Sequence, residues 1–241
     1  MNEQKITAIV LRAINHKEKD KILTVLSPEM GKISLLMRGV RSQSAKMKFA
    51  AGVFSFVEYM LTKTGDMWLV TGATEIESFF AISSDPEKYK YASAILELVD
   101  KVSVIGEQST SLFLLLIKSL KALAFGDIEP RFVFLKLCVD LFELSGYSIA
   151  GNKCSSCGAE FVGGAFFNTD QGCLVCSLCK APYSLSVSVG AASVIRILSI
   201  SDFDKLPSIK TQDGFKAEVE TLFVRNIAER FNCKLKSLSF L

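Results

Sequence analysis

The stretch Ile6-Thr7-Ala8-Ile9-Val10-Leu11-Arg12-Ala13 begins a series of short runs in which β-branched, apolar and aromatic residues recur. The five runs of the series span residues 6–13, 22–26, 32–38, 53–61 and 67–71. Turn-forming residues separate them, as at 27–31 and at Thr64-Gly65-Asp66. Such runs between turn signals predict β-strands. Five short strands without a helical period suit a small barrel better than a sandwich, which has about seven. We therefore predict an OB-type β-barrel.

From Pro86 onward the apolar spacing becomes helical. Pro86 stands at a favourable first helical position after Asp85, and Gly146 is a typical C-terminal cap. The predicted helices span residues 86–99, 110–125, 130–146, 188–199 and 215–231. The predicted fold is α+β, with a barrel domain over 1–82 and an all-α helical domain over 83–241. A cysteine-rich loop at 152–182 interrupts the helical domain.

That loop contains Cys154-Ser-Ser-Cys157 and Cys173-Leu-Val-Cys176-Ser-Leu-Cys179. Two CxxC pairs about 15 to 20 residues apart are typical of a tetrahedral zinc site, because each pair presents two thiolates to one ion. The second pair is either Cys173 with Cys176 or Cys176 with Cys179, since both spacings fit. No histidine lies nearby, so a structural ion with four thiolates is favoured over a catalytic one. A thiol redox role and a metal-free loop are the alternatives.

Composition limits the class of protein. About half of the 241 residues are apolar (49%) and 22% are charged, which excludes disorder. The longest apolar run in the most hydrophobic stretch, 112–117, is far shorter than the ~18 residues of a membrane span. We expect a cytoplasmic protein, because the N-terminus shows no secretory signal. In that compartment Cys138 and Cys233 are expected to be buried, and the single histidine, His16, leaves little room for triad chemistry.

The net charge is only +3, so binding to a polyanion has to rest on local charge. Between Lys32 and Lys48 there are five basic residues and no acidic one. The segment includes a polar loop whose guanidinium, hydroxyl and main-chain N–H groups are suited to phosphates. A solvated loop without a ligand is the alternative. Lys17, Lys19 and Lys21 form a weaker candidate, because acidic residues alternate with them. Strand aromatics could stack on bases, but core packing is the simpler explanation.

The order and spacing of several short motifs resemble those of the RecO family of bacterial recombination mediators. The matching motifs are Thr7-Ala8-Ile9-Val10-Leu11, Glu18-Lys19-Asp20-Lys21-Ile22-Leu23-Thr24, Gly31-Lys32-Ile33, Arg38-Gly39-Val40-Arg41, Gly146-Tyr147, Cys154-Ser-Ser-Cys157-Gly158, Cys176-Ser-Leu-Cys179 and Leu235-Lys236-Ser237-Leu238. They span nearly the whole chain. The family has an N-terminal OB-fold and a helical domain with a zinc-finger-like insertion, in agreement with the fold predicted above.

The resemblance implies a non-enzymatic protein that binds single- and double-stranded DNA and anneals complementary strands. It also implies a nucleoid-associated protein that works with RecR to load RecA onto DNA coated by single-stranded DNA-binding protein. The C-terminal tail of that last protein would bind the helical domain, with Arg131, Lys136, Arg225 and Arg230 as contacts. Neither a membrane nor a small-molecule substrate is implied.

Two sets of site residues follow. The DNA-binding set comprises Lys19, Lys21, Lys32, Arg38, Arg41, Ser44, Lys46 and Lys48. Family basic positions carry over to Arg38 and Arg41, whereas Gln43 and Ala45 replace common basic residues and shift the contact toward Lys46 and Lys48. The resemblance assigns one structural zinc ion to Cys154, Cys157, Cys176 and Cys179, with Cys173 in place of a family glycine. A zinc-containing interaction scaffold without DNA activity is the alternative function, and a zinc-dependent enzyme would need an open metal position or a carboxylate cluster.

Overall fold

The computed structural model describes residues 3–147, 149, 153–161 and 164–238. It divides into two compact units, Met1–Ala124 and Phe125–Leu241. The change in sequence period predicts a domain boundary at 82/83, and this boundary stays a prediction. Within the described residues, no helix combines the length and the apolar character that crossing a membrane requires.

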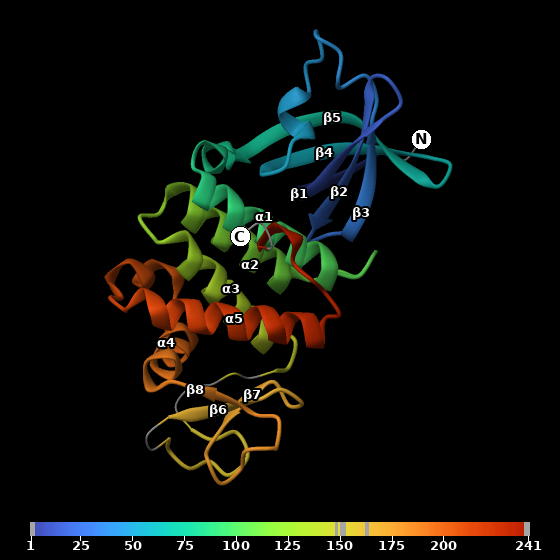
Figure 1. Ribbon diagram of the computed structural model, residues 1–241. Coiled ribbons are helices and arrows are strands. Elements are labelled where there is room, and N and C mark those ends of the chain that lie inside the picture. The colour runs from blue at the N-terminus through green and yellow to red at the C-terminus, as the bar shows by residue number, and fades with distance from the viewer. Residues whose placement is uncertain (1–2, 148, 150–152, 162–163, 239–241) are drawn as a thin grey trace. The chain divides into compact units, whose positions relative to one another are not determined.

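The first unit begins with five strands that close into a barrel in the order β1-β2-β3-β5-β4 (Figure 1). The strands are β1 (Glu3–His16), β2 (Asp20–Ser27), β3 (Gly31–Met37), β4 (Ser55–Thr64) and β5 (Met67–Ser78). The first half of β1 pairs with β4 and the second half with β2, and a register shift between Val10 and Arg12 lets the strand bend between its two partners. The predicted five-stranded barrel is confirmed.

Alternation of side chains along the strands builds the barrel core. Leu23, Leu35 and Val57 are fully buried inside it. The short 3-10 helix η1 (Lys48–Ala51) leads from the loop after β3 toward β4, and the buried Tyr59 hydroxyl donates to the Ala50 carbonyl at 2.6 Å. β5 runs seven residues beyond its predicted end at 71. Its extension is largely exposed and polar, so it lacks the apolar run by which the strand was recognised.

Two helices complete the first unit, α1 (Pro86–Val102) and α2 (Thr110–Phe125). After the short 3-10 helix η2 (Phe80–Ser84), the Asp85 side chain accepts hydrogen bonds from the first turn of α1 and caps it. The connector between the two helices returns to the barrel, where the Gly106 N–H donates to the Lys32 carbonyl at 3.0 Å. This bond anchors the helical pair at the start of β3.

The second unit contains α3 (Pro130–Leu144), α4 (Val189–Ile200) and α5 (Asp213–Arg230), with the 3-10 helices η3 (Phe203–Ser208) and η4 (Lys236–Leu238). Phe142 packs against Phe223 with ring centroids 5.5 Å apart, which joins α3 to α5. All five predicted helices are confirmed, with their ends shifted by at most three residues. α5 buries a single stripe at helical spacing, whereas α3 is buried on most sides, and both patterns show in the sequence.

Between α3 and α4 lies a small sheet in the order β7-β6-β8. Its strands are β6 (Ala165–Asn168), β7 (Cys173–Val175) and β8 (Leu185–Val187). The sequence predicted only a loop in this region, because strands of three or four residues are too short to show a period of two. Of the predicted loop 152–182, residues 152, 162 and 163 lie outside the described residues. The predicted α+β arrangement with an inserted cysteine loop is otherwise confirmed.

Candidate nucleic-acid interface and metal site

The loop that follows β3 is tied to the turn between β1 and β2. The Gly39 N–H donates to Asp20 Oδ1 at 2.8 Å, and the Arg41 N–H donates to the Lys19 carbonyl at 2.9 Å. The Arg41 guanidinium adds bonds from Nη1 to the carbonyls of Lys17 and Glu18, at 3.1 and 2.9 Å. Gly39 has a φ of +65°, a conformation that glycine adopts without strain. Segments that are twenty residues apart in sequence therefore form one surface.

This surface, which we call the basic rim, consists of the β1–β2 turn and the loop after β3. The exposed cations that the two segments bring together are Lys17, Lys19, Arg38 and Arg41, and Lys46 lies further along the loop with Ser44. The acidic residues of the two segments are Glu18 and Asp20, and Asp20 is occupied by the Gly39 N–H. The rim therefore has an excess of positive charge next to exposed main chain, which suits phosphate groups.

Two lysines of the predicted set close the loop instead of extending from it. Lys21 Nζ donates to the Ala51 carbonyl at 3.0 Å, and Lys48 Nζ donates to the Gln43 carbonyl at 2.8 Å. Both ammonium groups lie beside the rim, but each is positioned by the loop backbone. Lys17 belongs to the weaker candidate group with Lys19 and Lys21, but it is not among the predicted DNA contacts. The bonds from Arg41 to the turn reveal its place in the rim.

Lys32 lies apart from the other predicted DNA contacts. It stands at the start of β3, whereas Arg38 follows the end of that strand. Its ammonium forms an ion pair with Asp100 of α1 at 3.4 Å, and only 14% of its side chain is exposed. The Lys32 side chain thus joins the barrel to α1. The sequence does not distinguish Lys32 from the rim cations, because the order of basic residues along a segment does not show which part of the barrel surface each one occupies.

The second candidate site is a cluster of four thiols in the second unit. The Sγ atoms of Cys154, Cys157, Cys176 and Cys179 all lie within 4.8 Å of one another. In the first knuckle the Cys154 N–H donates to the Ala159 carbonyl and the Gly158 N–H to the Cys154 carbonyl, both at 2.8 Å. In the second knuckle the Cys179 N–H donates to the Cys176 carbonyl at 3.1 Å. Tight turns in both CxxC segments therefore present the thiols to a common centre.

Electrostatics within the cluster suit a cation. Burial alone would raise the pKa of Cys154, but hydrogen bonds to its sulfur from the N–H groups of Cys176, Cys157 and Ser156 lower that pKa to about 6. Hydrogen bonds from the Cys179 thiol to Cys157 and Cys176 raise the pKa of Cys179 to about 12. Cys157 Sγ and Cys176 Sγ lie 3.8 Å apart, within hydrogen-bond distance for sulfur. A set of four sulfur donors in this arrangement fits Zn²⁺ as a structural ion.

Cys173 is not part of the four-thiol cluster. It lies buried in β7, its Sγ donates to Gln171 Oε1 at 3.6 Å, and burial raises the pKa of its thiol. Spacing alone left two choices for the second pair. The fold separates them, because Cys173 is a strand residue paired with Asn168, whereas Cys176 begins the turn that leads to Cys179. Cys138 and Cys233, which were expected to be buried, are buried.

Comparison with known proteins covers nearly the whole chain. Residues 1–79 match the family described as Recombination protein O N terminal, and residues 83–239 match Recombination protein O C terminal. The chain belongs to the RecO family. It is 27% identical to the DNA repair protein RecO of Caldicellulosiruptor bescii over 98% of this chain and 96% of that protein. It is 30% identical to the proteins of the same name from Pelotomaculum thermopropionicum and Desulforamulus reducens, over 100% of this chain and 94% of each relative. The resemblance inferred from the short motifs is confirmed, and it places the chain among DNA repair and recombination proteins.

In this RecO-family protein the cysteine loop is attached to α5 through Arg230. Its Nη2 donates to the Thr169 carbonyl at 2.8 Å and also to the Asp170 carbonyl, both in the turn between β6 and β7. The guanidinium lies over the Tyr147 ring, 5.0 Å from its centroid. Gly172 allows this approach, because a Cβ there would lie 2.9 Å from Arg230 Nε. Arg230 is therefore a structural link between α5 and the cysteine loop.

The other predicted contacts of the helical domain are also engaged within the chain. Arg131 forms ion pairs with Asp213 at 2.8 Å and with Glu220 at 3.0 Å, and Lys136 pairs with Asp140 at 2.5 Å. The Arg131 guanidinium beside Asp213 lowers the pKa of that carboxyl. Arg131 thereby joins α3 to α5, whereas the Lys136–Asp140 pair lies within α3.

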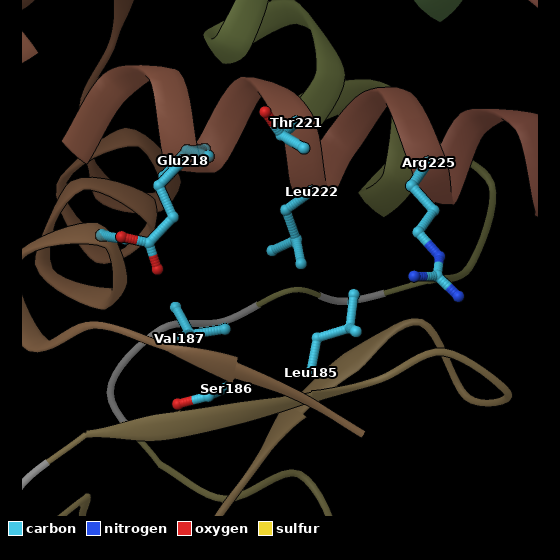
Figure 2. A pocket seen from close by; sticks show the side chains of 9 residues that line it. Leu185, Ser186, Val187, Glu218, Thr221, Leu222 and Arg225 are labelled. Atoms are coloured by element: carbon cyan, nitrogen blue, oxygen red, sulfur yellow. The ribbon is translucent and has the colours of Figure 1, made fainter. Parts of the chain in front are cut away.

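Arg225 differs from them because it borders a pocket between α5 and β8 (Figure 2). The pocket has a volume of about 460 Å³ and is lined mainly by apolar residues. Figure 2 shows Leu222 of α5 facing Leu185 and Val187 of β8, with Glu218 and Arg225 at opposite ends. The Glu218 carboxylate is occupied by the N–H and hydroxyl of Ser188, whereas Arg225 is half exposed and pairs only with Glu229 among the interactions described, at 3.0 Å. The pocket thus combines an apolar floor with an accessible cation.

Proposed function

We propose that this protein binds single- and double-stranded DNA and anneals complementary strands. With RecR as partner, it would load RecA onto DNA coated by single-stranded DNA-binding protein. The family assignment supports the general role in repair and recombination. The observation that carries the DNA-binding proposal is the basic rim, where Arg41 ties the β1–β2 turn to the loop after β3 and collects exposed cations on one surface. Arg38, Arg41, Ser44, Lys46, Lys19 and Lys17 would contact the phosphates, with Lys21 and Lys48 beside them.

Annealing requires no catalytic group, so we infer a protein that is not an enzyme. Two complementary strands repel each other through their phosphates, and cations held on a rigid barrel reduce that repulsion while the bases find their partners. Because the rim is built on strand ends and fixed by main-chain hydrogen bonds, its charges are already in place when DNA arrives. The association should therefore be fast and strongly dependent on salt.

The cysteine loop would have a structural role in the proposed DNA-binding protein. One zinc ion held by Cys154, Cys157, Cys176 and Cys179 would supply positive charge that favours the thiolate form of all four sulfurs. Four thiolates saturate a tetrahedral ion and leave no position for substrate. The ion would thus hold the two knuckles together, and β6 to β8 would be kept in register beside α5.

The tail of the single-stranded DNA-binding protein would bind the pocket between α5 and β8. This pocket suits a short acidic peptide that also contains apolar residues. The apolar side chains would pack on Leu185, Val187 and Leu222, and a carboxylate would pair with Arg225. Competition with Glu229 for Arg225 is modest, because the existing ion pair is exposed to solvent.

An annealing assay tests the main proposal. Two complementary oligonucleotides are mixed without nucleotide, and duplex formation is followed by fluorescence quenching. We expect the wild-type protein to accelerate annealing and the double substitution Arg38→Ala/Lys46→Ala to slow it by about tenfold or more at low salt. The charge-matched control is Lys101→Ala/Lys118→Ala, which removes two exposed lysines from α1 and α2. Wild-type protein that leaves the annealing rate unchanged would favour the interaction scaffold, and strand cleavage would favour an enzyme.

A further inference from the structure

The strand register places an aliphatic row on the outer surface of the barrel. Along the register, β1 lies beside β2, β2 beside β3, and β3 beside β5. The residues that are paired in succession across these four strands are Ile14, Ile22, Leu36 and Leu69. The row next to it, one residue along, contains Leu23 and Leu35, which are fully buried in the barrel core. Because successive side chains alternate between the faces of a sheet, the four aliphatic residues face outward.

This outer aliphatic row is accessible. Ile14 is 47% exposed, and the other three members are partly exposed. On the side away from the strand ends, the next outward row is polar and consists of Arg12, Thr24 and Ser34. Outward positions of a half-solvated sheet are normally polar, so four aliphatic residues in one continuous row are a departure from that pattern. The departure lies on the part of the barrel that borders the basic rim.

Charges flank the row on both sides. Ile14 lies three residues before Lys17 of the β1–β2 turn, and Leu36 lies two residues before Arg38. Arg12 borders the row on its other side and is exposed. The acidic groups nearby are Glu18, in the turn, and Asp20, which accepts a hydrogen bond from Gly39. An apolar strip between cations matches a chain that carries apolar rings on an anionic backbone, which is the chemistry of single-stranded DNA.

The aromatic residues of the barrel strands do not provide a stacking platform. Phe56, Tyr59 and Trp68 lie on the strands, Phe54 immediately precedes β4, and Phe49, which is 39% exposed, lies in η1 and not on a strand. Phe54 and Tyr59 are buried, and the ring of Phe56 packs against Phe113 with centroids 5.9 Å apart. Trp68 packs against the barrel core, and Lys63 Nζ lies 5.7 Å from its ring centroid. On the outer aliphatic row, aliphatic side chains would therefore make the contact with unpaired bases.

We propose that unpaired bases of single-stranded DNA lie on the outer aliphatic row, while the phosphates contact the basic rim and Arg12. The proposal rests on the DNA-binding function proposed above. It specifies that the row recognises the bases, whereas the rim and Arg12 recognise the phosphates. Duplex DNA keeps its bases stacked inside the helix, so only its phosphates would bind. Transfer of a base face from water to the row would thus make the protein favour single strands over duplex.

The test compares two oligomers of equal length and charge, oligothymidine and an abasic sugar–phosphate chain, by fluorescence anisotropy. We expect the wild-type protein to bind oligothymidine about five- to tenfold more tightly than the abasic chain. Ile14→Thr should remove most of this preference and leave the affinity for the abasic chain unchanged. Threonine is well tolerated in strands, so the barrel should remain folded.

Ile76→Thr is the matched control. Ile76 is also a strand isoleucine with similar exposure, 48% against 47% for Ile14, but it stands between Glu75 and Glu77 on the distant part of β5. This variant should keep the wild-type preference, and Leu36→Thr should behave like Ile14→Thr. The proposal is overturned if wild type binds both oligomers equally, or if Ile14→Thr and Leu36→Thr keep the preference while DNA binding persists. If the wild-type protein bound neither oligomer, the proposed DNA-binding function itself would be contradicted.

Discussion

Gly31 lies where the turn between β2 and β3 comes closest to the connector between α1 and α2. Its φ is +66°, and a Cβ at this position would overlap the backbone of Glu107. Nearby, the side chain of Gln108 donates to the Glu29 carbonyl, and the Gly106 N–H donates to the Lys32 carbonyl. This single glycine therefore allows the barrel and the α1–α2 pair to pack against each other.

Replacement of Gly31 by alanine should lower the free energy of unfolding by about 2–4 kcal/mol, from left-handed strain and steric overlap together. Gly65→Ala is the control, because its φ is +60° but no atom lies within 4 Å of the added Cβ. It should cost only about 1–2 kcal/mol of backbone strain. Urea denaturation of the two variants measures the difference. Equal losses of stability would mean that the backbone of Glu107 moves aside without penalty.

At the scale of elements, the cysteine loop is a short sheet and two knuckles with a small apolar core of its own. Cys154, Cys173 and Val175 form that core, and Arg230 joins the loop to α5. Three strands of three or four residues are too short to be stable alone. The contact with α5 and the proposed metal ion are therefore expected to provide most of the order in this loop.

Substitution of single cysteines tests the assignment of the ligands. Cys157→Ser should reduce the zinc content of the purified protein to well below one ion per chain, because a hydroxyl is a poor replacement for a thiolate. Cys173→Ser should retain one ion, since its sulfur lies outside the cluster. Elemental analysis by mass spectrometry measures both. Zinc loss in Cys173→Ser would contradict the assignment of Cys176 and Cys179 as the second pair, and full zinc content in Cys157→Ser would contradict the four-thiol site as a whole.

At the scale of the whole molecule, a net charge of only +3 conceals a local concentration of cations. The basic rim determines the proposed affinity for DNA, and its strength should appear in the dependence of binding on salt. Each phosphate contact that is lost reduces the slope of log affinity against log salt concentration by about 0.7 for single strands and about 0.9 for duplex.

Arg38→Ala should therefore lower this slope by nearly one unit on duplex DNA. Lys32→Gln removes the same charge at the other end of β3, where the ammonium is engaged by Asp100, and should leave the slope unchanged. Binding titrations at several salt concentrations give both slopes. A reduced slope for Lys32→Gln and an unchanged one for Arg38→Ala would move the interface from the rim to the junction with α1.

Local patterns along the chain were sufficient for the order of the barrel strands and of the α-helices. The apolar runs from 6 to 71 predicted the five barrel strands, and the helical spacing from Pro86 onward predicted the five α-helices, because the apolar residues of each element follow its own period. The extension of β5 and the strands β6 to β8 were not predicted. The extension is polar and exposed, and the three small strands are too short to establish a period.

The candidate sites depended more on tertiary structure. The sequence alone determined that a cluster of thiols and a basic segment exist, since residue type and spacing are local properties. For the thiols, the family resemblance had already assigned Cys176 and Cys179 where spacing left two choices, and the fold agrees by placing Cys173 outside the cluster. Only the fold decided that Lys17 lies beside Arg41, that Lys32 pairs with Asp100, and that Ile14 lies in line with Ile22 and Leu36. The physical reason is that strand register and long-range hydrogen bonds decide which distant residues share a surface, and a linear pattern does not contain that information.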